Sequence, residues 1–364
     1  MIREIKTCAA IAIAIAFTAC GGHGAAPENA PNGPDSMRMA PPDSTHRPPR
    51  PEFDPKRPWA HDPVIAIEGD TVYAFTTGHG IHQLRSLDLE TWEFDGPCIE
   101  ELPEWVKERN PTASLHLWAP DIIYHGGLWH LFYCSSNFAT NKSVIGHLTN
   151  KTLNRRSAAY KWEDKGLVLQ SVPNRDFWNA IDPNIAICAD GSAWMDFGSF
   201  WGGIKMVRLS DDLSQIADPQ EWHTISARPK MINPDDTSEK PGEGAVEAPF
   251  IFKHDGWFYL FVSFDYCCRG EESTYHVVCG RSKDIRGPYV DKSGERMDLG
   301  GGTRVDLPAA DNERYVAYGH CAMATLRGQD YMALHAYKRT DGQSELILRK
   351  VEWGDTGWPT LRGE

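Results

Sequence analysis

Three carboxylates at the starts of apolar, strand-like segments are the residues of this sequence best suited to chemistry. Asp62 lies in HDPVIAI, Asp182 in NAIDPN and Glu247 in VEAPFIF. Two carboxyl groups across a cleft suit glycoside hydrolysis, in which one protonates the leaving oxygen and the other activates a water molecule or attacks the sugar. The alternative is that these acids are ordinary loop ends, because Asp before Pro is common in turns.

The flanking residues predict a different role for each carboxyl group. Glu247 has the apolar neighbours Val246 and Ala248, and desolvation there would raise the pKa of its carboxyl group, as a general acid requires. We expect Asp62 to be the ionised base. Asp182 would raise the pKa of the acid by repulsion between like charges and would help to orient it.

Aromatic residues near the same strand starts could bind a sugar. The apolar face of a sugar ring packs on aromatic side chains, so we expect Trp118, Phe138 and Trp201 to contact the substrate. Ser199, in FGSFWGG, would offer a hydroxyl group, and the glycines of this motif would let the backbone approach the ligand. An aromatic residue in a β protein more often belongs to the core, which is the alternative for each ring.

An internal repeat indicates how residues so distant in the sequence could meet. Five segments each read as an apolar strand, a turn with Gly or Asp, and a second strand rich in aromatic residues, which is the signature of a β-hairpin. Each repeat has room for about four strands, and a propeller contains 4–8 such blades. We therefore predict an all-β, five-bladed β-propeller. A β-sandwich is the alternative, although its strands would not restart in one pattern so many times.

The innermost strands of a propeller line its central channel, so their first residues converge at one mouth. The sequence places at these positions Asp62, Trp118, Asp182, Glu247 and His320. A lone histidine is usually structural, but one on the propeller axis could hold a metal ion or a water molecule. This convergence would unite the candidate catalytic residues.

The N-terminal residues predict export. MIREIK is short and basic, and TCAAIAIAIAF is apolar but too short to span a bilayer, so residues 1–20 read as a signal peptide. Small residues before Cys20 resemble the lipobox of bacterial lipoproteins, which predicts a lipid anchor in the cell envelope; ordinary signal cleavage nearby is the alternative. Residues 21–57 are rich in Pro, Gly, Ala and Ser and predict a disordered tether, which leaves residues 58–364 for the catalytic propeller.

Composition and cysteine content narrow the function further. The chain has a formal net charge of −13 and no basic cluster, which argues against nucleic acid as a partner. Of nine cysteines, Cys8 and Cys20 fall in the leader, and the other seven are scattered without zinc-binding spacing. The neighbours Cys267 and Cys268 could form a vicinal disulfide or remain free thiols.

Seven motifs resemble glycoside hydrolase family 43, and in particular its endo-1,5-α-L-arabinanases. In chain order they are HDP, LWAPDI, NAIDPN, FGSFWGGI, VEAPFI, LFVSFDYCCRG and GRSKDIRGPYVD. The resemblance covers nearly all of residues 58–364. It implies a five-bladed propeller that hydrolyses α-1,5-linked L-arabinan with inversion of configuration, with water as the nucleophile.

The resemblance also implies roles for individual residues. Asp62 resembles the general base, Glu247 the general acid, and Asp182 the acid that adjusts the pKa of Glu247. The positions that resemble substrate contacts are Trp118, Phe138, Asn179, Ser199, Phe200 and Trp201. His320 resembles the axial histidine beside a bound calcium or similar ion, and no organic cofactor is implied.

Local departures from the family pattern leave the substrate details open. VEAP stands where the family often has VEGP, GHC replaces the more usual GHN, and His79 and His147 are additional histidines. The same scaffold could therefore be an exo-acting α-L-arabinofuranosidase or a β-xylosidase. A non-catalytic glycan-binding lipoprotein is a further alternative, although binding alone does not require three carboxylates at one mouth. A scaffold for protein partners would need neither the acids nor the aromatic residues.

Overall fold

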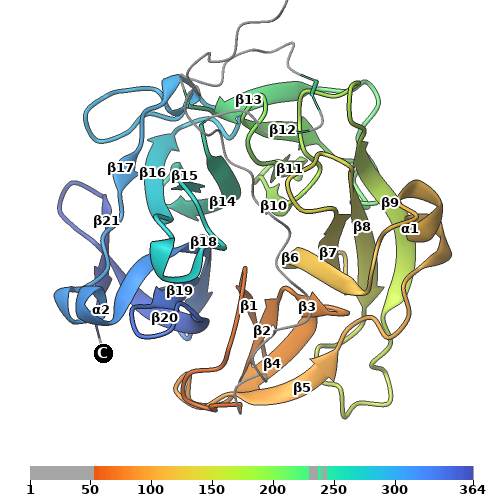
Figure 1. Cartoon of the computed structure of the whole chain (residues 1–364), viewed down its shortest axis with the longest axis horizontal. Coiled ribbons are helices and arrows are strands. Elements are labelled where there is room, and N and C mark those ends of the chain that lie inside the picture. The colour runs from red at the N-terminus through yellow and green to blue at the C-terminus, as the bar shows by residue number, and fades with distance from the viewer. Residues whose placement is uncertain (1–52, 229–236, 239, 241–243, 364) are drawn as a thin grey trace, which may run out of the picture. The chain divides into compact units, whose positions relative to one another are not determined.

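The computed structural model describes residues 53–228, 237–238, 240 and 244–363, and these fold into a β-propeller. Five antiparallel sheets surround a central axis (Figure 1), four of them with four strands and one with five. The prediction of an all-β, five-bladed propeller is therefore confirmed. The leader, Cys20 and most of the predicted tether lie outside the described residues.

Each sheet forms one blade, with strands in chain order from the axis outwards. Blade one contains β1 (Val64–Glu68), β2 (Thr71–Thr76), β4 (His82–Ser86) and β5 (Glu93–Pro97). Blade two contains β6 (His116–His125), β7 (Leu128–Ser136), β8 (Ser143–Asn150) and β9 (Glu163–Ser171), with β3 (Gly78–His79) paired to β6. Blade three contains β10 (Asn184–Ile187), β11 (Ala193–Phe197), β12 (Ile204–Arg208) and β13 (Trp222–Ser226).

The last two blades follow the same order. Blade four contains β14 (Val246–His254), β15 (Trp257–Phe264), β16 (His276–Ser282) and β17 (Thr303–Arg304). Blade five contains β18 (Tyr315–Leu326), β19 (Gln329–Lys338), β20 (Ser344–Trp353) and β21 (Pro359–Arg362). The described helices are short: α1 (Glu104–Arg109), α2 (Ala309–Arg314) and the 3-10 turns η2 (Gly270–Glu272) and η3 (Met297–Leu299). None of them is long and apolar enough to cross a membrane.

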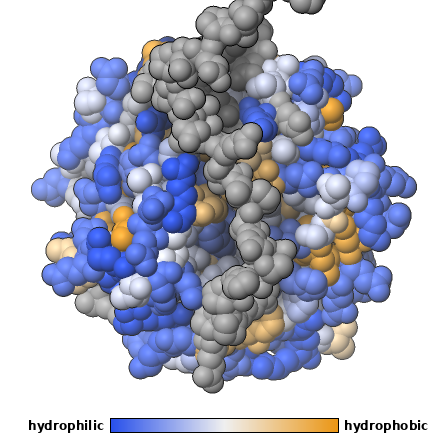
Figure 2. All heavy atoms as spheres, in the orientation of Figure 1, coloured by the Kyte–Doolittle hydropathy of each residue, from blue (hydrophilic) through white to orange (hydrophobic). Residues whose placement is uncertain are grey.

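The hydrophobic core lies between neighbouring blades. Central strands such as β15 (WFYLFVSF) combine aromatic and β-branched residues, which suit a pleated surface that is buried on both faces. Phe261 of blade four and Leu334 of blade five are fully buried in one shared cluster. On the visible surface of the described residues, hydrophilic side chains predominate (Figure 2). The blades therefore stabilise one another rather than folding as independent sheets.

The ring of blades is closed by contacts between innermost strands. The strands β1, β6, β10, β14 and β18 each contact the innermost strand of the next blade, and β18 contacts β1. The segment before β1 adds a second closure, because the Leu346 amide in β20 donates to the Pro58 carbonyl at 3.0 Å. Trp59 forms a β-bridge with Glu345 beside it. The first and last blades are thus held together directly.

One residue within or just before each innermost strand has a left-handed backbone conformation. The five residues and their φ values are Asp62 (51°), Ala119 (42°), Asp182 (53°), Ala248 (55°) and His320 (48°). Residues other than glycine seldom adopt such values, and they occur where the surrounding structure requires them. The recurrence identifies these five residues as structurally equivalent positions around the mouth.

This equivalence corrects the alignment predicted from the sequence. Glu247 and Trp118 each lie one residue before the equivalent position, which Ala248 and Ala119 occupy. The register shifts at the same place in β14 (Glu247/Phe250), β6 (Trp118/Asp121) and β18 (Gly319/Ala322), so Glu247 and Trp118 take the position just before the bulge, which Gly319 takes in β18. A bulge redirects side chains in a strand. Glu247 and Trp118 therefore reach the mouth from a different backbone position than Asp62.

Candidate active site

The four titratable residues predicted at the mouth lie close enough to influence one another. His320 Nδ1 lies 3.0 Å from Asp62 Oδ1, and Asp182 Oδ2 accepts a hydrogen bond from the Ala248 amide, next to Glu247, at 3.1 Å. The charges of Asp62, Asp182 and Glu247 all raise the pKa of His320. The structure thus brings together residues from blades one, three, four and five.

Asp62 is held by hydrogen bonds to both carboxylate oxygens. Its Oδ1 lies 3.0 Å from His320 Nδ1 and 3.1 Å from His61 Nδ1, while Thr77 Oγ1 donates to Oδ2 at 2.5 Å. Burial alone would raise the pKa of this carboxyl group. The positive charges and hydrogen bonds of His320 and His61 outweigh burial and hold the pKa of Asp62 well below its usual range. Asp62 is therefore ionised at neutral pH, as a general base must be.

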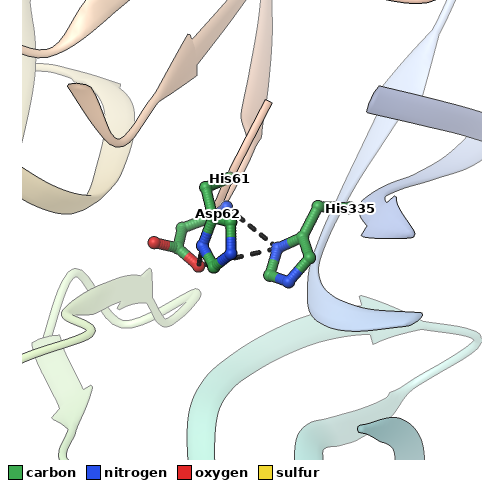
Figure 3. Close-up of side chains that lie close together, drawn as sticks. All are labelled: His61, Asp62 and His335. Carbon is green, nitrogen blue, oxygen red and sulfur yellow. Dashed lines mark hydrogen bonds and ion pairs between the residues drawn. The ribbon is translucent and has the colours of Figure 1, made fainter. Parts of the chain in front are cut away.

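The aromatic side chains of His61, His335 and Tyr337 pack together beside Asp62 and hold it in place. Figure 3 shows the imidazoles of His61 and His335 beside the Asp62 carboxylate, and the two rings stack at a centroid distance of 4.0 Å. His61 Nε2 hydrogen-bonds to Tyr337 Oη at 2.7 Å, and the Asp62 amide donates to His335 Nδ1 at 3.0 Å. Sequence reasoning did not single out Thr77, His335 or Tyr337. These residues could have been found from the sequence, because each is a polar residue near the end of the second strand of a repeat, which lies at the mouth.

The pKa values of Glu247 and Asp182 are raised, whereas that of Asp62 is lowered. Burial raises the pKa of Glu247 to about 8, and the nearby Asp182 charge reinforces this shift. Burial also raises the pKa of Asp182 to about 7, with His320 opposing the shift and Asp62 adding to it. Glu247 consequently keeps its proton at neutral pH, which is the state of a general acid.

His320 supplies the positive charge between these acids. Burial on its own would lower the pKa of its imidazole, but the Asp62 carboxylate raises it to about 9. Its backbone amide donates to Ser263 Oγ at 2.9 Å, which holds the backbone of β18 at His320. The imidazolium therefore faces the acids as a fixed cation.

Hydrogen bonds between neighbouring blades position four of the five equivalent residues. In each case a side chain of one blade accepts a hydrogen bond from a backbone amide of the next. The pairs are Thr77 with Ala119, Asp182 with Ala248, Ser263 with His320, and His335 with Asp62. These contacts link blade one to blade two and join blades three, four, five and one in series, which fixes the geometry of the site.

The predicted substrate-binding residues of blade three differ in their surroundings. Ser199 forms a β-bridge with Glu247, and the Phe200 amide donates to the Val246 carbonyl at 2.8 Å, so both lie beside the acid. Trp201, by contrast, is only 2% exposed, and its indole N–H donates to the Ser238 carbonyl at 2.7 Å. The burial favours a packing role for Trp201.

The remaining predicted contacts lie in or near blade two. Phe138 is 57% exposed and half-buried Trp118 lies in β6, so both rings are accessible. Asn179 is buried, and its Oδ1 accepts a hydrogen bond from Ser143 Oγ at 2.6 Å. Its amide group therefore serves the local structure, while its role toward a substrate stays a prediction.

The described residues do not form a cage for calcium. His61, Asp62 and His335 place ligand atoms within 4.8 Å of one another, but calcium takes six to eight oxygen ligands and this group offers mainly imidazole nitrogen. Both His61 nitrogens and His335 Nδ1 already form hydrogen bonds. His320 Nδ1 pairs with Asp62. The ion predicted near His320 stays a prediction, and no step below is routed through it.

Comparison with curated proteins identifies relatives that share most of the chain. This chain is 47% identical over 302 residues to the extracellular exo-α-(1→5)-L-arabinofuranosidase ArbA of Cellvibrio japonicus. The match covers 83% of this chain and 86% of the relative. The chain is 36% identical over 310 residues to the extracellular endo-α-(1→5)-L-arabinanase 1 of Bacillus subtilis, covering 82% and 87%. The names of these two relatives give different modes of attack, exo for the first and endo for the second.

Solved structures and a family model agree with these relatives. The Cellvibrio cellulosa α-L-arabinanase complexed with arabinohexaose matches with a TM-score of 0.80 and 44% identity, covering 84% of this chain and 96% of that structure. The exo-1,5-α-L-arabinanase from a bovine ruminal metagenomic library matches with a TM-score of 0.79 and 41% identity, covering 86% and 100%. The model of glycosyl hydrolases family 43 matches residues 57–359. With its propeller fold and its mouth of carboxylates, the chain therefore belongs to glycosyl hydrolases family 43.

Proposed function

We propose that this protein hydrolyses α-1,5-linked L-arabinan with inversion of configuration. The observation that carries the proposal is the opposite protonation of two carboxyl groups at one mouth: Asp62 is ionised and Glu247 is protonated. The relatives named as arabinanases and arabinofuranosidases support the choice of substrate.

In the proposed reaction, Asp62 removes a proton from a water molecule, whose oxygen attacks the anomeric carbon. Glu247 donates its proton to the departing glycosidic oxygen as the bond breaks through an oxocarbenium-like transition state. Thr77 and His61 hold Asp62 in place, and Asp182 keeps the pKa of Glu247 high. Afterwards Asp62 carries a proton and Glu247 does not, so exchange with solvent restores the starting state.

Inversion predicts the anomer that forms first. Hydrolysis of an α-linkage should release the β-anomer, which proton NMR can detect before mutarotation. We also expect the Asp62 and Glu247 carboxyl groups to lie roughly 6.5–9.5 Å apart in a complex with an arabino-oligosaccharide, which leaves room for the water. Initial release of the α-anomer, or a separation near 5 Å, would indicate retention and refute the mechanism.

We propose endo cleavage as the main mode of attack. The Bacillus subtilis relative named as an endo enzyme supports it, whereas the relative at 47% identity is named as an exo enzyme and makes exo attack the second candidate. Debranched arabinan, followed by product size over time, separates the two. Mixed oligosaccharides at early times would establish endo attack, and arabinose alone would establish exo attack. Cleavage of aryl β-xylosides but not of arabinan would favour the β-xylosidase alternative. Binding of arabinan without any product would favour the non-catalytic glycan-binding alternative.

We propose that the enzyme acts outside the cytoplasm and that a lipid on Cys20 anchors it to the cell envelope. The two relatives named as extracellular support export. The lipobox-like sequence before Cys20 supports the anchor, and this segment lies outside the described residues. Labelled fatty acid should be incorporated by the wild-type chain and not by Cys20→Ala. Equal labelling of both would refute the anchor at Cys20.

A further inference from the structure

Two neighbouring cysteines lie at the mouth of the propeller and have no part in the mechanism above. Cys267 and Cys268 follow β15, whose mouth end pairs with the first residues of β14, including Glu247. Cys268 is exposed and Cys267 is half-buried, whereas Cys98, Cys134, Cys279 and Cys321 are buried. An oxidant in solution can therefore reach this pair more easily than the buried thiols.

The two sulfur atoms are close enough to bond. Cys267 Sγ and Cys268 Sγ lie 2.7 Å apart. A disulfide bond is about 2.05 Å long, whereas unbonded heavy atoms pack best at about 3.5–4.0 Å. Thiols that remain unbonded must therefore move apart, while a disulfide requires only a small further approach. Exported proteins meet the oxidising conditions in which disulfides form and persist.

The pair is connected to the proposed catalytic base by a short chain of hydrogen bonds. The Cys268 amide donates to Tyr337 Oη at 2.9 Å, and Tyr337 Oη hydrogen-bonds to His61 Nε2 at 2.7 Å. His61 Nδ1 in turn lies 3.1 Å from Asp62 Oδ1. A displacement of the backbone at Cys268 would therefore alter the support of Tyr337 and, through His61, of Asp62.

We propose that Cys267 and Cys268 form a reversible disulfide, and that the oxidised pair holds the Cys268 amide against Tyr337 so that His61 keeps Asp62 in its working position. A small-molecule disulfide would be the oxidant. The Cys268 thiolate attacks one sulfur of the oxidant, which releases one thiol. The Cys267 thiolate then displaces the second thiol as the new S–S bond forms. The protein loses two protons and two electrons, and the oxidant gains them as it is reduced to two thiols.

Exposure supports this order of attack. Cys268 is exposed whereas Cys267 is half-buried, so the oxidant meets the Cys268 sulfur first. The thiolate is the nucleophile in thiol–disulfide exchange.

The first test uses the whole exported chain and does not depend on substrate. Intact-mass and peptide analysis after treatment with oxidised glutathione should show the loss of two hydrogen atoms, located at residues 267–268 and restored by dithiothreitol. Hydrogen exchange at the Cys268 amide should be slower in the oxidised protein, because the disulfide holds this amide on Tyr337. An unchanged mass, or equal exchange in both states, would overturn the proposal.

The second test rests on the proposed function and measures hydrolysis of debranched arabinan. Reduction should lower kcat by about tenfold with little change in KM, since small misplacements of catalytic groups are costly. Cys268→Ser should show no response to reductant, while Cys188→Ser, a matched change at a half-buried cysteine outside the mouth, should keep the full response. A response that persists in Cys268→Ser, or an equal kcat in both states, would refute the link to Asp62. Failure to hydrolyse arabinan in either state would count against the proposed function and leave the mass and exchange results to decide on the disulfide.

Discussion

Asp62 and Glu247 are half-buried carboxyl groups at the same mouth, yet the structure moves their pKa values in opposite directions. Asp62 accepts hydrogen bonds from Thr77 and lies against the imidazoles of His61 and His320, which stabilise its negative charge. Glu247 instead is buried near the Asp182 charge, which destabilises its ionised form. The neighbouring residues, and not the residue type, thus separate the base from the acid.

The Glu247→Gln variant should lose activity selectively. The amide keeps the size of the side chain but has no acidic proton, so kcat on arabinan should fall by about 10²–10⁴-fold. Aryl arabinofuranosides with good leaving groups need little protonation, and their hydrolysis should fall much less. Steady-state kinetics on both substrates checks this. Equal losses on the two would contradict the role of Glu247 as general acid.

The pH dependence of the reaction should reflect the raised pKa of Glu247. Activity requires the protonated form, so kcat/KM should decline as the pH rises through about 8. Asp182→Asn removes the charge that reinforces this shift, so the decline should move to lower pH. Asp190→Asn, at an exposed carboxylate, is the matched control and should leave the profile unchanged. A decline that stays in place in Asp182→Asn would show that Asp182 does not adjust the acid.

At the scale of the element, the second strands of blades one, four and five support the residues that the innermost strands bring to the mouth. Thr77 follows β2, and its hydroxyl group both donates to Asp62 and accepts the buried Ala119 amide of blade two at 2.7 Å. His335 in β19 of blade five acts similarly, because its Nδ1 accepts a hydrogen bond from the Asp62 amide. The mouth is therefore built by pairs of strands from neighbouring blades.

Thr77→Val should weaken both the fold and the catalysis. Valine has a similar shape but leaves the buried Ala119 amide without its acceptor, which should lower the free energy of unfolding by about 1–3 kcal/mol. It also removes one hydrogen bond from Asp62, so kcat should fall. Thr77→Ser keeps the hydroxyl group and is the matched control. Chemical denaturation and kinetics check both effects, and a valine variant as stable and active as the serine variant would contradict this role.

At the scale of the whole molecule, the ring has to be closed for the mouth to keep its geometry. Blade five contacts blade one through β18 and β1, and through the Pro58 carbonyl that accepts the Leu346 amide. Ala60 is fully buried in the cluster that these two blades share. The short segment before the first strand thus completes the last blade.

Truncation of this segment should destabilise the propeller. A chain that starts at Phe53 should melt at the same temperature as a chain with the full N-terminus, while one that starts at His61 loses the closure. We expect that loss to cost about 2–3 kcal/mol, which lowers Tm by at most about 4–12 °C, the shift expected for a domain of roughly 150–250 residues, because the shift is smaller in a larger domain. Calorimetry of the two truncated chains checks this. Equal melting temperatures would show that contacts between β1 and β18 close the ring alone.

Local patterns were enough to predict the fold and to locate the acids. Each hairpin carries its own apolar strands and turn residues, so the blades could be recognised and counted within short segments. The apolar neighbours of Glu247 predicted the raised pKa that its burial produces. These features depend on residues close together in the chain, and the amino-acid sequence by itself determined them.

Only the tertiary structure decided which residues support the acids and how they reach the mouth. His335 lies 273 positions from Asp62 in the chain, yet it accepts the Asp62 amide. The register shift that follows Glu247 is seen only in its pairing with β15, although the shared proline (Pro249 here, Pro63 after Asp62) marks the one-residue offset in the sequence. Hydrogen bonds between blades depend on side chains from different repeats meeting at the axis. That meeting is a property of the closed ring, which no short segment of sequence contains.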